Sequence, residues 1–245
     1  MVVSSPHRPG RGIGTVWRVG VTVVSILLVE SLVCGLALLP AVLSWVWLFT
    51  WIAPDLLLRA FVISLLIVPS YVVFALCLMT LSAIAARVTG ARTPPDVETR
   101  IADFEWPLMT WARYMVATHL VRVLAGSLFR GSPIWTAYLR LNGARIGRRV
   151  YVNTLFISDH NLLEFGDDVV IGGDVHLSGH TVEGGIMKTG RVRLGPNVTV
   201  GLGSVIDIDT DVGQNCQIGA MSLVPKHTTL DANGVYAGVP VTRLR

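Results

Sequence analysis

A six-residue repeat between Leu194 and Val224 constrains the fold of this 245-residue chain more than any other feature. An aliphatic residue recurs at every sixth position: Leu194, Val200, Ile206, Val212, Ile218 and Val224. A small or β-branched residue stands four positions after each of the first five: Val198, Ser204, Thr210, Cys216 and Ser222. An α-helix repeats at about 3.6 residues and a strand at about two, so neither explains this period. The repeat predicts a parallel β-helix, a coil of triangular turns with the aliphatic residues facing the axis.

The repeat begins earlier, at Ile146, and it is interrupted twice on the way to Leu194. Between Val152 and Phe165 the register slips by one residue, across the segment Ser158-Asp159-His160-Asn161. Leu177 and Leu194 are seventeen positions apart, which is not a multiple of six. The second interruption therefore predicts a loop, residues 178–188, that leaves the packed coil and is open to substrates.

This loop carries His180, Glu183 and Lys188 within nine residues, flanked by glycines. Because a neutral imidazole can take a proton at physiological pH, His180 is the candidate general base toward a hydroxyl or an amine. Glu183 is expected to orient the other ring nitrogen of the histidine, or to position the acceptor. Lys188, Asp159 and His160 are candidates for contacts with the acceptor or the loop. A solvated loop with incidental charges is the alternative.

Two long apolar runs precede the repeat, at 15–52 and 56–88, with a turn between them. Both exceed the roughly 20 residues that a membrane span needs. The mean hydropathy of the chain is +0.60 and only 15% of its residues are charged, which is unusual for a soluble domain. The runs predict a helical membrane hairpin, with a cleaved signal peptide as the alternative for the first. Glu30 in the first run predicts an interhelical or intersubunit hydrogen bond.

Arginine dominates the charge of the chain, with eighteen arginines and two lysines and a pI near 9.3. Arginines precede the first run and follow the second: Arg8, Arg11, Arg18, Arg87, Arg92 and Arg100. The positive-inside rule then places both ends of the hairpin, and the coil, in the cytoplasm. We expect a multi-pass protein of the bacterial inner membrane whose arginines meet lipid headgroups, with no nucleic-acid partner.

The expected domain order is a cytoplasmic tail (1–14), two transmembrane helices (15–88), a linker with amphipathic interfacial helices (89–143) and a β-helix (144–245). Tryptophan and arginine alternate between 104 and 141, which is typical of the headgroup layer. A helix that packs on the end of the coil is the alternative, and both can hold. His119 in this segment is expected to be packed or interfacial. The cysteines, Cys34, Cys77 and Cys216, imply no disulfide framework.

Residues 165–245 resemble the hexapeptide-repeat acyltransferase superfamily. His180 matches the loop histidine that acts in that family as general base toward an acyl thioester. The segment YAGVPV at 236–241 resembles the AGxPA segment that closes the family's coil, and GAMSLVPK at 219–226 resembles the lining of its pantetheine channel. The resemblance implies a left-handed parallel β-helix, a homotrimer with sites between neighbouring coils, and no bound metal or other cofactor. The candidates for donor contacts are Ala220, Ser222, Lys226, Gly238 and Arg243. For Lys226 and Arg243 a surface salt bridge is the alternative.

A longer resemblance covers nearly the whole chain. The order of two spans, a Trp/Arg-rich connector, AYLRLNGARIGRRV and the loop GHTVEGGIMKTGRVRLG is similar to the membrane-bound C-terminal region of ε-poly-lysine synthetase and related non-ribosomal peptide synthetase modules. Those proteins combine six spans with three acyltransferase-like domains, so this chain corresponds to one third. Three copies would restore six spans in a closed ring. Because no adenylation or thiolation region is present, the expected donor is acyl-CoA or a separate carrier protein.

The leading hypothesis is a membrane-anchored acyltransferase that moves an acyl or aminoacyl group from a thioester to an amine or hydroxyl. Backbone N–H groups of a neighbouring coil would stabilise the oxyanion. The second hypothesis is a zinc hydratase resembling the γ-carbonic anhydrases, with His160, His176 and His180 as ligands, although their spacing differs from that family's. The third is a non-catalytic scaffold that anchors or trimerises a peptide synthetase.

Overall fold

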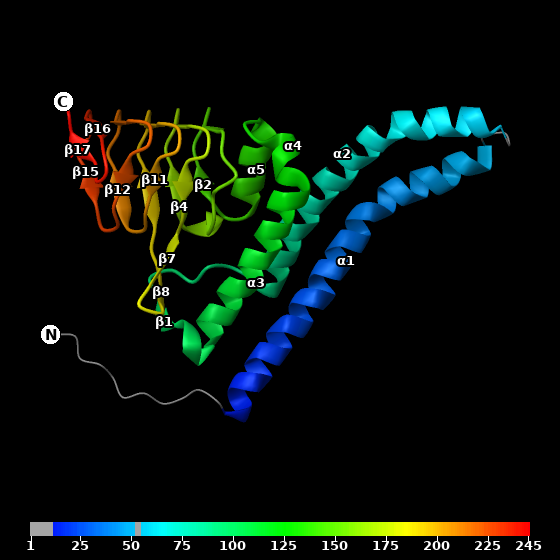
Figure 1. The fold of residues 1–245 in the computed structure, drawn as a ribbon, viewed down its shortest axis with the longest axis horizontal. Coiled ribbons are helices and arrows are strands. Elements are labelled where there is room, and N and C mark those ends of the chain that lie inside the picture. The colour runs from blue at the N-terminus through cyan, green and yellow to red at the C-terminus, as the bar shows by residue number, and fades with distance from the viewer. Residues whose placement is uncertain (1–11, 52–54) are drawn as a thin grey trace.

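The computed structural model describes residues 12–51 and 55–245. The chain runs from a pair of long helices through a helical connector into a coil of short strands (Figure 1). Nearly all of the predicted tail, and most of the predicted turn at 53–55, lie outside the described residues.

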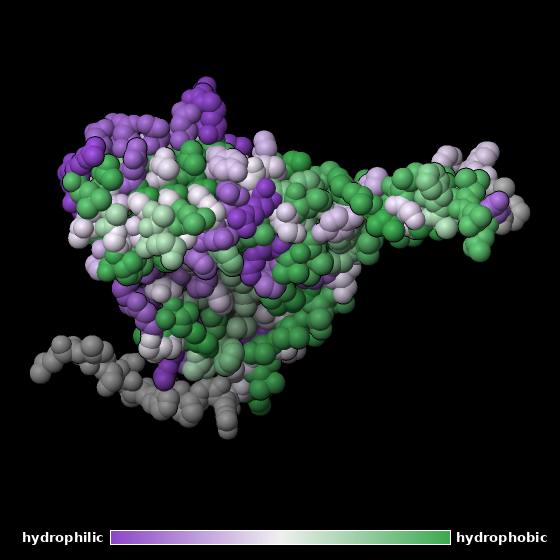
Figure 2. Space-filling model, turned by 45° about the horizontal axis from the view of Figure 1, so that its top comes forward, coloured by the Kyte–Doolittle hydropathy of each residue, from purple (hydrophilic) through white to green (hydrophobic). Residues whose placement is uncertain are grey.

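The two apolar runs form the long helices α1 (Ile13–Trp51) and α2 (Leu56–Thr89). The Asp55 side chain caps α2 by accepting from the backbone N–H groups of Leu57 and Leu58, and Gly90 ends the helix in the left-handed conformation. Both helices are long and apolar enough to cross a membrane, and an 18-residue window in each has a mean hydropathy of 2.4 in α1 and 2.6 in α2. Each contains a proline, Pro40 or Pro69, and the pair bends along its length (Figure 1). Beyond the bend the helices form a hydrophobic arm (Figure 2).

The connector holds the long helices against the coil. It comprises β1 (Glu98–Arg100), the 3-10 helix η1 (Ile101–Asp103), α3 (Trp106–Val121), the π-helix η2 (Arg122–Gly126), α4 (Ser127–Phe129) and α5 (Pro133–Leu141). Helix α3 packs against both α1 and α2. Helix α5 covers the first coils, where the buried Trp135 donates through Nε1 to the carbonyl of Thr154 at 3.0 Å.

The coil has three parallel faces, as the six-residue repeat predicts. The first face contains β2 (Arg145–Ile146), β4 (Leu163–Phe165), β9 (Val192–Leu194), β12 (Thr210–Val212) and β15 (Thr229–Leu230). The second contains β3 (Tyr151–Val152), β5 (Val170–Ile171), β10 (Thr199–Val200), β13 (Gln217–Ile218) and β16 (Val235–Ala237), and β17 (Thr242–Arg243) joins it antiparallel. The third contains β6 (His176–Leu177), β11 (Val205–Ile206) and β14 (Leu223–Val224).

The strand register confirms both predicted interruptions of the repeat. In the regular part Gln217 lies opposite Thr199, 18 residues earlier, which is one coil of three hexads. Glu164 lies opposite Arg145, 19 residues earlier, and the extra residue falls where the 3-10 helix η3 (His160–Leu162) forms. Val192 lies opposite Leu163, 29 residues earlier, so the coil expels eleven residues there.

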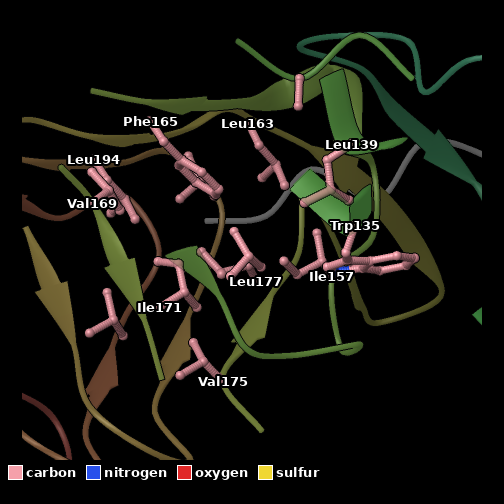
Figure 3. Packing of buried hydrophobic residues seen from close by; sticks show 14 of the residues in the cluster. Trp135, Leu139, Ile157, Leu163, Phe165, Val169, Ile171, Val175, Leu177 and Leu194 are labelled. Atoms are coloured by element: carbon pink, nitrogen blue, oxygen red, sulfur yellow. The ribbon is translucent and has the colours of Figure 1, made fainter. Parts of the chain in front are cut away.

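The interior of the coil is filled by the residues that the repeat assigns to it. Each of the six aliphatic positions from Leu194 to Val224 is at most 2% exposed, and the small positions between them are equally buried. Figure 3 shows the same kind of packing in the earlier coils, where Phe165, Ile171 and Leu177 point into the interior, with Trp135 and Leu139 of α5 at one end of the cluster. The same cluster includes Ala75 and Leu78 of α2. Because a buried leucine contributes about 1.5–3 kcal/mol, the long helix and the coil stabilise each other through one shared core.

One corner of the coil is built from stacked asparagines. Asn197, Asn215 and Asn233 adopt φ values of 59°, 59° and 60°. Their side-chain amides hydrogen-bond from coil to coil, at 3.0 Å between the first two and 2.8 Å between the last two. Asparagine tolerates the left-handed conformation better than other residues with a Cβ, since its short amide bonds locally.

We expect Asn215→Ala to destabilise the fold by about 1–2 kcal/mol, because it removes two amide contacts and places an ordinary Cβ at a left-handed position. Asn215→Gly should cost less, since glycine adopts this conformation without strain. Unfolding temperatures of the purified variants give the comparison. An alanine variant as stable as wild type would show that this corner does not depend on asparagine.

Candidate active site

The expelled residues form a β-hairpin beside the coil. Strands β7 (His180–Glu183) and β8 (Ile186–Thr189) pair antiparallel, and Gly184 and Gly185 make the two-residue turn with φ of +55° and +76°. Strand β1 of the connector pairs with β8 (Figure 1). A backbone hydrogen bond of 2.9 Å from Gly190 to Gly179 closes the base of the hairpin. The expelled hairpin and β1 of the connector therefore form a three-stranded sheet that positions His180 beside the coil.

His180 contacts the carboxylate of Asp159, which lies in the segment of the one-residue slip. The distance from His180 Nδ1 to Asp159 Oδ2 is 2.6 Å, and the Asp159 side chain is fully buried. Five further groups donate to this carboxylate: Thr93 Oγ1 at 2.5 Å, Ser158 Oγ at 3.0 Å, the Gly179 backbone N–H at 3.1 Å, Trp111 Nε1 at 3.2 Å and Ser178 Oγ at 3.4 Å. Burial raises the pKa of Asp159, but the hydrogen bonds and charge of His180, with Thr93 and Ser158, outweigh it and lower the pKa below its usual range.

This geometry sets the state of the His180 ring. Because an ionised carboxylate only accepts, Nδ1 carries the hydrogen and Nε2 keeps its lone pair in the neutral ring. Nε2 has no hydrogen-bond partner among the described residues, and the side chain is 21% exposed. The Trp111 ring packs edge-on against the imidazole, with 4.9 Å between ring centroids. The result is an oriented, accessible imidazole nitrogen of the kind that removes protons.

Gly179 permits the close approach of hairpin and carboxylate. A Cβ at this position would lie 2.8 Å from the Asp159 Cβ and 2.9 Å from a methyl carbon of Leu162. Thr93 and Trp111, which also hold Asp159, come from the linker and α3 and were not predicted. Only the tertiary fold brings them to the hairpin, more than forty residues away in sequence.

The prediction that Glu183 orients His180 is wrong. Glu183 lies at the far end of β7, where its exposed carboxylate pairs with Lys226 of the coil. The hydrogen bond from Lys226 lowers the pKa of Glu183 below its usual range. Asp159 occupies the orienting position instead. Lys188 pairs with Glu98 of β1 at 3.3 Å, which ties the hairpin to the connector.

His160 is a core residue and is not open to an acceptor, contrary to expectation. Its side chain is buried edge-on to Tyr114 and Tyr138, with ring centroids 6.1 Å and 5.7 Å away. Burial lowers the pKa of His160 to about 4, so the ring is neutral at physiological pH. His176 stacks on Phe156 at the third face, with centroids 4.5 Å apart. The zinc candidates His160, His176 and His180 thus lie in separate surroundings, and the described residues contain no group of three metal-ligating side chains.

The predicted donor contacts fall on the later coils. Ala220 and Gly238 occupy equivalent exposed positions one coil apart. Ser222 is buried, and its hydroxyl accepts from the Gly238 backbone N–H at 3.2 Å, so its side chain cannot reach a donor. Lys226 is paired with Glu183, and Arg243 lies 3.9 Å from Asp231.

His160 should make folding sensitive to pH. Its folded pKa of about 4 lies below the ordinary value of about 6.5, so the unfolded chain takes up a proton that the folded chain rejects. Stability is unaffected above pH 6.5 and falls as pH drops toward 4, by on the order of 3 kcal/mol in total. Unfolding temperatures of wild type and His160→Gln are measured between pH 7 and 4.5. The unfolding temperature should fall less steeply with decreasing pH in the variant than in wild type. Equal slopes would contradict this assignment.

Comparisons with known proteins identify relatives, although no protein-family model matches the chain. It is 36% identical over 121 residues to galactoside O-acetyltransferase of Escherichia coli, covering 46% of this chain and 58% of that protein. It is 32% identical over 111 residues to delta-poly-L-ornithine synthetase of Acinetobacter baumannii, covering 45% of this chain and 8% of that protein. The chain therefore spans less than two thirds of both relatives.

A solved structure of galactoside acetyltransferase in complex with coenzyme A matches 55% of this chain and 80% of its own, with 22% identity and a TM-score of 0.43. One sequence relative is an acetyltransferase and the other is a poly-ornithine synthetase. The two resemblances noted in the sequence were to these same two kinds of protein. The resemblance of this chain to the hexapeptide-repeat acyltransferases is confirmed.

Proposed function

We propose that this protein is an acyltransferase in which His180, oriented by Asp159, acts as general base. The observation that carries the proposal is the 2.6 Å contact between His180 and a fully buried carboxylate, on the hairpin that the coil expels. The acceptor hydroxyl or amine gives its proton to Nε2 while its oxygen or nitrogen attacks the acyl carbon. The C–S bond then breaks, and the proton passes to the departing thiolate.

The buried carboxylate supports both halves of this step. Before the attack it selects the tautomer with Nδ1 protonated, which leaves Nε2 as the base. After the proton transfer its negative charge lies 2.6 Å from the new imidazolium and stabilises it. Trp111 limits rotation of the ring by packing on its side. The pair of Glu183 and Lys226 joins the hairpin tip to the coil, and we assign it to holding the hairpin rather than to proton transfer.

The donor is a thioester of CoA or of a carrier protein, and Ala220 and Gly238 mark the exposed corner where it would lie. The acetyltransferase relative supports transfer of an acyl group to oxygen, and the synthetase relative supports an aminoacyl group or an amine acceptor. The proposal therefore covers an acyl or aminoacyl group and a hydroxyl or amine acceptor. Lys226 and Arg243 are secondary candidates for the donor phosphates.

We place the site in a homotrimer. Leu202, Met221 and Val239 form an exposed apolar corner of the coil, with exposed fractions of 57%, 69% and 70%. Exposed apolar surface of this kind favours contact between subunits. A neighbouring coil would then supply the backbone N–H groups for the oxyanion and the second wall of the donor channel.

We also place α1 and α2 across the bacterial inner membrane, with the coil in the cytoplasm. Only 17% of the most apolar window of α1 and 11% of that of α2 are buried, whereas a core helix of a soluble protein is mostly buried. Trp47, Trp51 and Leu57 on the arm expose more than half of their surface. Lipid tails would cover this surface, and Arg87 at the end of α2 would face the cytoplasmic headgroups.

His180→Ala and Asp159→Asn should each lower acyl transfer by about 10²–10⁴-fold, because one removes the base and the other its orientation. Glu183→Gln should stay within about threefold of wild type, since it breaks only an exposed ion pair. Thiol release from acetyl-CoA with hydroxyl and amine acceptors measures the rates, and unfolding temperatures confirm that the variants fold.

Full activity in His180→Ala would overturn the proposed mechanism. A wild-type protein that binds no thioester in calorimetry would instead favour the non-catalytic scaffold.

Leu202→Asp should convert the trimer to smaller species, because it places a charge in the apolar corner. Leu244→Asp changes another exposed leucine near the C-terminus and should leave the trimer intact. Light scattering in detergent gives the masses. A monomeric wild type would refute the trimer.

A further inference from the structure

A cavity of about 550 Å³ lies between the end of α2, the following linker and the first face of the coil. Four arginines line it: Arg87 from the last turn of α2, Arg92 from the linker, Arg145 from β2 and Arg191 from the segment before β9. Tyr114, Asn142 and Asn161 are among its other lining residues. Neither His180 nor Asp159 lines this cavity, and the proposed acyl transfer does not use it.

The positive charge around the cavity is only partly compensated by carboxylates. Its lining contains no aspartate or glutamate. Glu164, which lies outside the lining, is shared by Arg145 at 3.1 Å and Arg191 at 3.6 Å. The side chains of Arg87 and Arg92 have no hydrogen bond or ion pair with any residue that the structure describes. Guanidinium groups gathered around a cavity with one shared carboxylate attract an anion.

The chemistry of the cluster selects among anions. A guanidinium presents parallel N–H donors that match the oxygens of a phosphate group in a bidentate pair. Arg87 is also favourable at the C-terminal end of a helix, but Arg92 and Arg145 lie outside helices and have no such role. The volume of the cavity exceeds that of a single phosphate ion, so there is room for a group attached to the phosphate.

We propose that this cavity binds a phosphate group, carried either by an anionic lipid headgroup or by a soluble molecule. If α2 spans the membrane as proposed, the cavity opens at the depth of the cytoplasmic headgroups. The cavity also adjoins the acyl-transfer site. Asn161 in its wall hydrogen-bonds both backbone groups of Thr93, at 3.2 Å and 2.9 Å, and the Thr93 hydroxyl donates to Asp159. Two residues, Asn161 and Thr93, would therefore connect a bound phosphate to the carboxylate that contacts His180.

The test uses the full-length protein in detergent with two probes. Native mass spectrometry compares retention of phosphatidylglycerol with that of neutral phosphatidylcholine, and calorimetry measures binding of inorganic pyrophosphate. The test variant is Arg87→Gln/Arg92→Gln, which breaks no ion pair. The charge-matched control is Arg148→Gln/Arg149→Gln at an exposed corner of the coil, where only the surface pair of Arg149 with Asp168 is lost. Unfolding temperatures establish that both variants are folded. If the Arg87→Gln/Arg92→Gln variant does not fold, the single variant Arg92→Gln replaces it in the test.

We expect wild type and control to prefer phosphatidylglycerol over phosphatidylcholine, and the test variant to bind it at least about tenfold more weakly. Pyrophosphate binding that depends on the same arginines, without a lipid preference, would support the site and identify a soluble ligand. Equal binding by wild type and the test variant, or no binding of either probe, would overturn the proposal. Because no thioester is involved, this outcome is independent of the acyltransferase assignment.

Discussion

The buried carboxylate of Asp159 is the group on which the arrangement of the site depends. An ionised carboxylate is costly to bury unless it is fully hydrogen-bonded, and here six groups from four parts of the chain donate to it. Those partners join the linker, α3, the slipped segment and the hairpin. The same interaction therefore stabilises the junction of these elements and orients His180, so the proposed base is held in place by the fold that surrounds it.

The packed interior of the coil contributes rigidity rather than chemistry. Its interior is filled by aliphatic side chains that repeat every hexad, and such a packed core has no space for a reactive group. Two departures from the period provide that space. The one-residue slip forms η3 and turns Asp159 toward the hairpin, and the eleven-residue insertion carries His180 out of the coil. The regular hexads thus form the rigid coil, the one-residue slip supplies Asp159, and the eleven-residue insertion supplies His180.

The helical part is continuous with the coil and is not a separate anchor. Residues of α2, α5 and the first coils share one hydrophobic cluster, and α3 contributes Trp111 to the carboxylate network. The proposed phosphate cavity lies at this same junction. A single wall, formed by Thr93 and Asn161, separates it from the proposed acyl-transfer site. The cavity and the hairpin would therefore keep a fixed position relative to the proposed membrane surface.

The sequence by itself determined the parallel coil, both of its interruptions and the position of His180 on the expelled hairpin. The reason is that the six-residue period can be read from neighbouring residues along the chain, without knowledge of the tertiary contacts. It also indicated the two long apolar helices. The tertiary structure alone decided the partner of His180, since Asp159, Thr93 and Trp111 are distant in sequence and follow no shared spacing. Glu183 was favoured by its closeness along the chain, but an extended strand carries it away from His180 and toward Lys226. Burial of His160 between two tyrosines likewise depended on α3 and α5, which the repeat does not describe.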